Sequence, residues 1–108
     1  MAGIDAKQVG VEMVFLGKGR VACVTLRNER KLNTMNSALM EEFIAAMRAL
    51  ATDDELRAVV VTGAGPKSFV GGADIYEMAG LDPAGARAFI TRVHGCCLAV
   101  REMPVPVI

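Results

Sequence analysis

The chain has 108 residues, so a single domain is the most it can form. Its 12 basic and 12 acidic residues cancel, which leaves no basic surface to attract nucleic acid or a membrane. Its apolar stretches are shorter than the roughly 18 residues that a membrane span requires, and its first residues lack the pattern of a secretory signal.

The N-terminal segment predicts a β-hairpin. Residues 1–10 lack hydrophobic periodicity and are expected to be a flexible N-terminus, followed by one domain over 11–108. Apolar and polar residues alternate over 11–15, and an uninterrupted apolar run occupies 21–26. The glycines and charges at 17–20 predict the turn between two short strands.

A helix is expected after the polar loop at 27–35. Asn33 or Asn36 is expected to cap it, because a short side-chain oxygen accepts an unpaired backbone N–H. Apolar residues then recur on one face, which is the signature of a helix packed on a core. They are Leu39, Met40, Phe43, Ile44, Met47 and Leu50.

The run at 58–62 predicts a strand buried on both faces, as in a parallel sheet. The high hydrophobic content, 53%, fits such a covered sheet or a surface that expects a partner or the rest of a larger domain. A glycine-rich loop follows, then a short helix from about Asp74.

Asp82-Pro83 predicts the start of another helix, with Asp as the cap and Pro at the first position. Its apolar face is expected at Ala86, Phe89, Ile90, Val93, Cys97, Val100 and Met103. Residues 104–108 are typical of the entry to a strand. The order β-β-α-β-loop-α-β indicates an α/β fold with parallel pairing.

Gly71-Gly72-Ala73 is the strongest candidate for chemistry. Consecutive glycines let a ligand approach the backbone, and a turn that enters a helix leaves N–H groups unpaired. Such groups suit an oxygen that becomes negative during a reaction, although a turn that needs glycine only for packing has the same composition. A P-loop and a dinucleotide-binding loop are both excluded, because Pro66 and Val61 stand where glycine is required and no third glycine opens a long helix.

Several segments, in this order and spacing, resemble the enoyl-CoA hydratase/isomerase (crotonase) family. The central one is Lys67-Ser68-Phe69-Val70-Gly71-Gly72-Ala73-Asp74-Ile75-Tyr76-Glu77-Met78. The others are Val24-Thr25-Leu26-Arg27-Asn28, Leu32-Asn33-Thr34-Met35-Asn36, Leu56-Arg57-Ala58-Val59-Val60-Val61-Thr62-Gly63 and Pro104-Val105-Pro106-Val107-Ile108. The resemblance covers about residues 11–108 and implies the N-terminal half of a crotonase-like (ClpP/crotonase) ββα superhelix.

The resemblance also implies a function, namely an acyl-CoA thioester enzyme and in the first instance an enoyl-CoA hydratase. The backbone N–H of Ala73 would be one donor of an oxyanion hole, presented by the turn at Gly72. Contacts to coenzyme A would come from Arg30, Lys31, Leu32, Gly71, Asp74 and Ile75. No metal and no cofactor other than the coenzyme A of the substrate is expected.

Two positions depart from the family pattern, and other family features have no match. Glu29 stands where proline is frequent, and Tyr76 where a basic residue is common, which affects phosphate contacts. The second oxyanion donor and the two catalytic glutamates lie beyond the matched segments, so the 108-residue chain alone is expected to be inactive. Its own glutamates are expected to be solvated surface carboxylates: Glu41, Glu42, Glu55, Glu77 and Glu102.

Alternatives remain at this point. The family also contains isomerases, hydrolases and decarboxylases, and a non-catalytic interaction module would use the same apolar surfaces. His94 is interpreted as a helix surface residue, and a triad with Ser68 has no support in the sequence. The three cysteines, two of them adjacent, predict buried free thiols in the cytoplasm. Family members imply a homo-oligomer, a trimer or hexamer.

Overall fold

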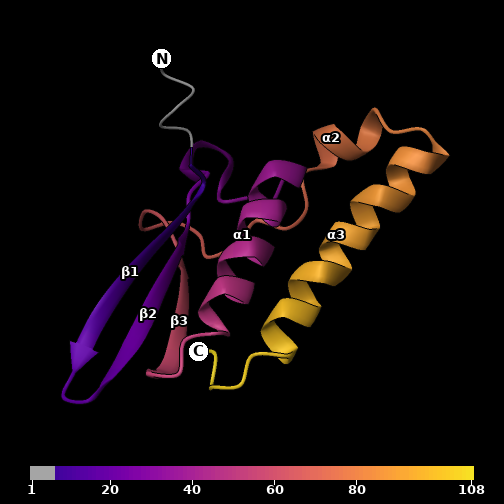
Figure 1. Ribbon diagram of the computed structural model, residues 1–108. Helices are drawn as coiled ribbons and strands as arrows, with labels where there is room; N and C mark the ends of the chain where they lie inside the picture. The colour runs from indigo at the N-terminus through magenta and orange to yellow at the C-terminus, as the bar shows by residue number, and fades with distance from the viewer. Residues whose placement is uncertain (1–6) are drawn as a thin grey trace.

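A three-stranded mixed sheet forms one side of the molecule (Figure 1). In this computed structural model, residues 7–108 are described. Strands β1 (Val9–Leu16) and β2 (Gly19–Leu26) pair antiparallel, and β2 pairs parallel with β3 (Leu56–Gly63), in the order β1-β2-β3. The predicted hairpin and the predicted parallel pairing are therefore confirmed.

Strand β1 begins earlier than the sequence predicted. Val9 and Gly10, expected in the flexible N-terminus, belong to the strand, and Val9 is buried. The cause is a side chain from the first helix, since Glu42 accepts hydrogen bonds from the N–H groups of Gln8 (2.9 Å) and Val9 (3.0 Å). The prediction for residues 1–6 falls outside the described residues.

Three helices accompany the sheet. Helix α1 (Ser37–Leu50) lies between the sheet and α3 (Pro83–Arg101). The short α2 (Ile75–Ala79) lies near one end of the two longer helices (Figure 1). Asn36, and not Asn33, caps α1 by accepting from the Leu39 N–H. Asp82 caps α3 as predicted, and the loop before α1 contains one 3-10 turn, η2 (Glu29–Lys31).

The core lies between the sheet and α1. The apolar face predicted for α1 is confirmed, because every member is buried except Ile44, which is half-buried. The sheet contributes the side chains that face α1, namely Ala22, Val24, Leu26, Leu56 and Val59. The prediction that β3 is buried on both faces was wrong. Helices cover one face only, so Val60 remains half-buried and Thr62 exposed.

The apolar face predicted for α3 is confirmed only in part. Phe89 and Met103 are buried and Val93 and Val100 are half-buried, whereas Ala86 is exposed. Ile90 is 59% exposed and Cys97 is also exposed, whereas Cys96 and Ala99 are buried. Small residues allow close approach, and a Cβ at Gly95 would lie 2.8 Å from Cδ1 of Ile44. Burial raises the pKa of the Cys96 thiol to about 11. The expectation of three buried thiols therefore fits Cys96 alone, although all three cysteines are free.

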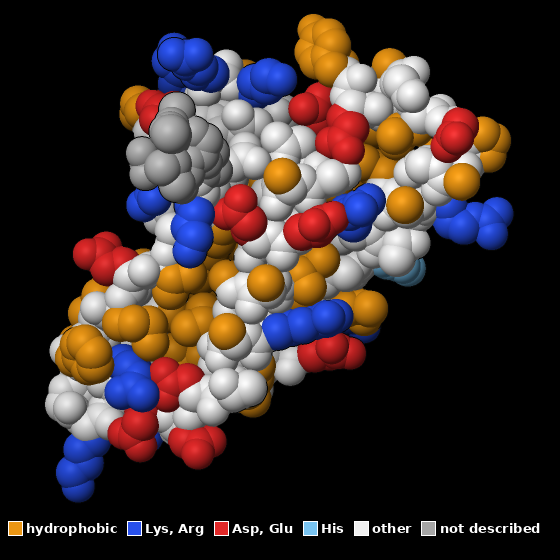
Figure 2. Space-filling model, turned by 45° about the horizontal axis from the view of Figure 1, so that its top comes forward, with side chains coloured by type: hydrophobic (Ala, Val, Ile, Leu, Met, Phe, Trp, Pro, Cys, Tyr) orange, Lys and Arg blue, Asp and Glu red, His pale blue; other side chains and the backbone are white. Residues whose placement is uncertain are grey.

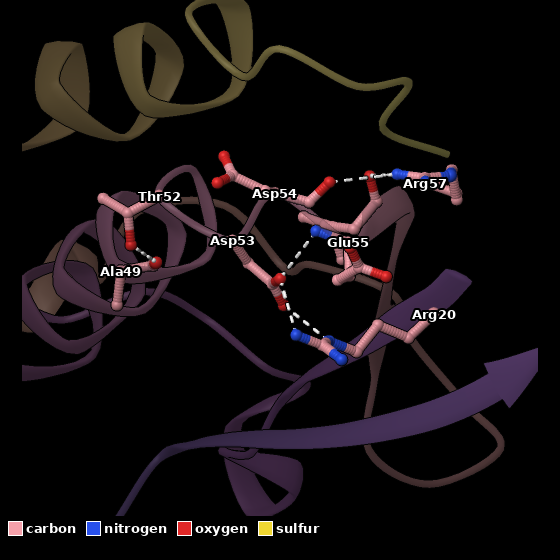
Figure 3. Close-up of polar contacts among 8 residues, drawn as sticks. Arg20, Ala49, Thr52, Asp53, Asp54, Glu55 and Arg57 are labelled. Carbon is pink, nitrogen blue, oxygen red and sulfur yellow. Dashed lines mark hydrogen bonds and ion pairs between the residues drawn. The ribbon is translucent and has the colours of Figure 1, made fainter. Parts of the chain in front are cut away.

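A polar cluster fixes the crossover from α1 to β3 (Figure 3). The carboxylate of Asp53 receives two bonds from the Arg20 guanidinium, at 2.7 and 2.8 Å, and one from the Glu55 N–H at 2.9 Å. The Arg20 hydrogen bond is the main cause that lowers the pKa of Asp53. This pair ties the start of β2 to the turn that precedes β3.

The last residues, predicted to be the entry to a strand, pair with β3. Val107 forms a parallel bridge with Val59, and the Ile108 N–H donates to the Val59 carbonyl at 2.8 Å. The N–H of Val61 in turn donates to the Ile108 carbonyl at 2.8 Å. The segment therefore adds to the edge of the sheet opposite β1.

Exposed apolar side chains gather on the hairpin. Figure 2 shows them at the lower left, interspersed with charged groups. In β1 they are Val11, Val14, Phe15 and Leu16, of which Phe15 is 70% exposed. Within residues 7–108, no helix has the length and apolar character needed to cross a membrane.

Candidate functional site

Two loops lie side by side at the end of the molecule where α1 begins, and we call them the loop pair: residues 28–36 and 63–74. Their backbones form a short parallel bridge between Met35 and Ala73. The Met35 N–H donates to the Gly72 carbonyl (2.8 Å), and the Asp74 N–H donates to the Met35 carbonyl (3.0 Å). A weaker bond of 3.3 Å runs from the Gly71 N–H to the Asn33 carbonyl.

This bridge determines the direction of the Ala73 peptide groups. In parallel pairing, the residue between the two bonded peptide groups directs its own N–H and C=O to the opposite side. The Ala73 N–H accordingly makes no hydrogen bond within residues 7–108. Ala73 as a residue is half-buried, and an N–H without a partner is available to an acceptor oxygen. Which oxygen it binds stays a prediction.

Asn33 holds the two loops of the pair together. Its side chain is 1% exposed and its backbone has a positive φ of 58°, a conformation that asparagine tolerates. The side-chain amide donates to the carbonyls of Ala64 and Ser68, both at 2.9 Å, and its oxygen accepts from the Asn28 N–H at 2.8 Å. Because Asn33 is buried, loss of a partner for its amide costs about 1–3 kcal/mol.

Glycine is needed at the two positions before Ala73 for different structural reasons. A Cβ at Gly71 would lie 2.7 Å from the Leu32 carbonyl oxygen, so the close approach of the loops requires glycine. Gly72 has open space around it but a φ of 95°, which side chains rarely allow. The packing explanation left open by the sequence therefore applies to Gly71, and the turn explanation to Gly72.

Asp74 links the loop to helix α2. Its carboxylate is buried and caps α2 by accepting from the N–H groups of Tyr76 (2.9 Å) and Glu77 (3.2 Å). Ala73 is thus fixed on one side by the bridge to Met35 and on the other by the capped first turn of α2.

A cavity of about 300 Å³ opens over the loop pair. Ala73 and all six residues predicted to contact coenzyme A line it, together with Thr34 and Tyr76: Arg30, Lys31, Leu32, Gly71, Asp74 and Ile75. Gly72 is not part of this lining. The structure therefore brings together segments that lie about 40 positions apart in the sequence.

The two departures from the family pattern lie in different places. Glu29 does not line the cavity, because its carboxylate lies against Gly65, whose Cβ would be 2.3 Å from Oε2. Tyr76 does line it and is 80% exposed. The carboxylate of Glu29 is therefore not part of the cavity lining.

A second, apolar cavity of about 490 Å³ adjoins the loop pair. Met35 and Val70 line it where they flank the bridge, and Phe43, Val61 and Ile108 contribute from the core side. The backbone of Met35 pairs with Ala73 while its side chain faces this cavity. The loop pair thus separates a cavity with basic residues from an apolar one.

The other candidate groups do not assemble into a catalytic arrangement. His94 is exposed on α3. The hydroxyl of Ser68 donates to the Leu32 carbonyl at 2.8 Å and so serves the loop pair. In the described part of the chain, no cluster of three or more His, Cys, Asp or Glu side chains could hold a metal ion.

Sequence reasoning missed the contacts of three glutamates that were expected to be solvated surface carboxylates. Of these, Glu41 is exposed as expected, and Glu42 and Glu77 are half-buried. Glu42 anchors β1, and Glu41 forms an ion pair with Arg92 at 2.5 Å. Glu77 accepts hydrogen bonds from both the backbone N–H and the hydroxyl of Ser37. No local pattern could have indicated these contacts, because each joins residues at least 33 positions apart.

The sequence matches the family model described as enoyl-CoA hydratase/isomerase over residues 17–108. The chain belongs to the enoyl-CoA hydratase/isomerase family. It is 42% identical over 72 residues to the short-chain-enoyl-CoA hydratase of Clostridium acetobutylicum, which is 67% of this chain and 28% of that protein. It is 34% identical over 96 residues to a mitochondrial Delta(3,5)-Delta(2,4)-dienoyl-CoA isomerase of Rattus norvegicus, 79% of this chain and 29% of that one.

Solved structures of the enoyl-CoA hydratase/isomerase family confirm the predicted fold class. An enoyl-CoA hydratase of Bacillus anthracis superposes with a TM-score of 0.83 at 29% identity, over 93% of this chain and 38% of that chain. The hydratase of Thermoplasma volcanium gives 0.82 at 27% identity, over 96% and 40%. This chain therefore spans about two fifths or less of the length of these relatives.

Proposed function

We propose that this chain binds an acyl-CoA thioester and serves the hydration of a 2,3-enoyl-CoA. The observation that carries this proposal is the unpaired Ala73 N–H beside a cavity with basic residues at its rim. A thioester carbonyl gains negative charge when it becomes an enolate. A fixed N–H aimed at that oxygen lowers the barrier by roughly 3–4 kcal/mol, by analogy with other oxyanion holes.

The proposed role of each residue follows from its place in the loop pair. Ala73 supplies the N–H, and Gly72 supplies the positive-φ turn that presents it. The exposed side chains of Arg30 and Lys31 attract the phosphates of coenzyme A, and Leu32, Gly71, Asp74 and Ile75 form the wall. The neighbouring apolar cavity, which Val70 and Met35 line, has the chemistry expected for an acyl chain.

Relatives of both kinds, hydratase and isomerase, use the same scaffold, so the reaction type rests on the names of the relatives and on no residue of this chain. Hydration is favoured because enoyl-CoA hydratases are frequent among the similar proteins. Isomerisation is the alternative that the rat relative supports. A homo-oligomer, a cytoplasmic location and the absence of a separate cofactor complete the proposal.

Calorimetric titration of the chain with butyryl-CoA tests the thioester site. We expect saturable binding that weakens as salt is added, because phosphate contacts are screened. The double variant Arg30→Ala/Lys31→Ala should lose roughly tenfold in affinity, as expected for two exposed charge contacts. The control Lys18→Ala/Arg48→Ala removes the same charge from exposed positions outside the cavity and should leave affinity unchanged.

Two outcomes would contradict the proposal. One is the absence of any heat of binding at millimolar butyryl-CoA. The other is equal weakening by both double variants, which would mean that the phosphates respond to net charge and not to this cavity. Size-exclusion chromatography with light scattering on the same samples tests the interaction-module alternative, which a tightly self-associating chain blind to coenzyme A would support.

A further inference from the structure

Helix α2, which follows Ala73, has no packing of its own to hold it. None of its residues is buried, and its apolar side chains face solvent: Ile75 is 68% exposed, Tyr76 80% and Met78 45%. A helix of 5 residues is also too short to be stable alone. Something other than apolar burial must fix its position.

One side chain joins α2 to the well-packed helix α1. Oε1 of Glu77 accepts from the Ser37 N–H at 2.9 Å, and its Oε2 accepts from the Ser37 hydroxyl. Within residues 7–108, no other side chain of α2 makes a hydrogen bond outside its own helix. Glu77 is therefore the tether between the two helices.

The position of this tether suits a carboxylate. Ser37 is the first residue of α1, where backbone N–H groups lack partners within the helix. Glu77 itself lies in the first turn of α2. The positive end of each helix dipole favours a negative charge at this point. Helix α1 is anchored in turn by its buried apolar face, so it is a firm support.

The tether is connected to Ala73 by a short path of bonds. The N–H of Glu77 donates to the Asp74 carboxylate at 3.2 Å, and the N–H of Asp74 donates to the Met35 carbonyl at 3.0 Å. A shift of α2 would therefore move Asp74 and weaken its bond to Met35. Met35 also holds the Gly72 carbonyl, whose peptide group carries the Ala73 N–H, so a loosened bridge would free that N–H to change direction.

We propose that Glu77 is a positioning residue that fixes the direction of the Ala73 N–H by tying α2 to Ser37. Its side chain is not part of the cavity lining, so its role would be exerted through α2. The inference rests on the proposed thioester site, whose oxygen acceptor this amide would meet. Removal of the tether should leave Arg30 and Lys31, the proposed phosphate contacts outside α2, in place and weaken the bond to the carbonyl.

Three variants remove the Glu77–Ser37 hydrogen bonds to different degrees. Glu77→Ala removes the tether. Glu77→Gln keeps an oxygen that accepts from the Ser37 N–H and an amide that donates to the hydroxyl. It should therefore retain most of the wild-type contact between α2 and Ser37. Ser37→Ala retains the backbone bond and should give an intermediate result. Glu102→Ala is the control, because Glu102 is an exposed carboxylate with no side-chain hydrogen bond in the described residues.

The first readout is the infrared carbonyl stretch of bound butyryl-CoA labelled with ¹³C at the thioester carbon. A hydrogen bond to the oxygen lowers this frequency. We expect Glu77→Ala to lose at least half of the wild-type downshift while its Kd for free coenzyme A changes less than twofold. Glu77→Gln should recover most of the downshift. A full downshift in Glu77→Ala would overturn the proposal, as would a parallel loss of coenzyme A affinity.

The second readout needs no ligand and separates this inference from the proposed function. Amide hydrogen exchange should accelerate at least tenfold at Ser37 and Asp74 in Glu77→Ala, with core amides of α1 unchanged. Unchanged exchange at both positions would overturn the tether. If exchange accelerates as expected but the wild-type chain binds no thioester, the tether stands as a structural feature and the proposed function fails with its role for Glu77.

Discussion

The core beneath α1 and the loop pair both contain buried side chains, but of opposite kinds. In the core they are apolar, such as Val24, Leu39, Met47 and Val59, each 0% exposed. In the loop pair they are Asn33 and Asp74, the buried polar residues of the described chain. Apolar burial is non-directional, whereas hydrogen bonds fix distance and angle. The core supplies stability, and the loop pair supplies the direction of one amide.

Substitution in the core should have the largest effect on stability. Leu39→Ala removes a fully buried side chain from α1, so the free energy of unfolding should fall by about 2–5 kcal/mol. Urea denaturation followed by circular dichroism measures it. Leu98→Ala, at a position 43% exposed on α3, is the control and should change stability by less than about 1 kcal/mol. Equal effects would mean that the core is not where we place it.

Substitution of Asn33 should have the next largest effect on the free energy of unfolding. It should also weaken ligand binding at the cavity. Asn33→Asp replaces the two N–H donors with an acceptor, and the carbonyls of Ala64 and Ser68 lose their partners. We expect a loss of about 1–3 kcal/mol in unfolding free energy, with weaker butyryl-CoA binding.

Asn28→Asp provides the matched comparison for that substitution. The Asn28 side chain donates mainly to a single carbonyl, that of Thr34, at 2.8 Å, so it should cost less stability than Asn33→Asp. The reverse order in urea denaturation would show that Asn33 is not the centre of the loop pair.

The two glycines should separate steric from conformational constraint. The Cβ added by Gly72→Ala lies in open space, so the substitution should lower the free energy of unfolding only through the positive φ, by about 1–2 kcal/mol. Gly71→Ala meets the Leu32 carbonyl, so the loops must move apart and the Met35–Ala73 bridge should weaken. Amide exchange at Asp74 should therefore rise more in Gly71→Ala than in Gly72→Ala, and the opposite ranking would be evidence against the steric explanation.

The smallest effect should come from the ion pair far from the loop pair. Arg20 lowers the pKa of Asp53 in the folded state, so this carboxylate stabilises the fold above its unfolded pKa of about 3.9. That contribution is lost as pH falls through the lowered folded pKa. Asp53→Asn should therefore be less stable than wild type at pH 7, with the difference narrowing below about pH 4. A difference independent of pH would exclude a charge effect.

The same contrast explains what the sequence could predict. The face of α1 follows from the spacing of large apolar residues, and Asp82-Pro83 marks the start of α3 through local chemistry. Part of the face of α3 was missed because its contact with α1 also uses the small residues Gly95, Cys96 and Ala99, which carry little hydrophobic signal.

Contacts within the loop pair, and the Glu77–Ser37 contact beside it, were beyond local patterns. The Asn33 side chain reaches residues 31 and 35 positions away, and Glu77 reaches Ser37 at 40 positions. The glycine-rich segment was a candidate from its residues alone, whereas the residues around the cavity were predicted only through resemblance to a family. Geometry then showed how the backbone of Met35 leaves the Ala73 N–H unpaired.

The central claim concerns that single amide, and ¹H–¹⁵N NMR of the chain titrated with butyryl-CoA tests it most directly. We predict that the Ala73 amide proton exchanges rapidly in the free chain, then moves downfield and exchanges slowly when the thioester binds. The neighbouring Asp74 amide, already bonded to Met35, should change little. An Ala73 amide that is protected before any ligand is added, or that stays unchanged at saturation, would contradict the account.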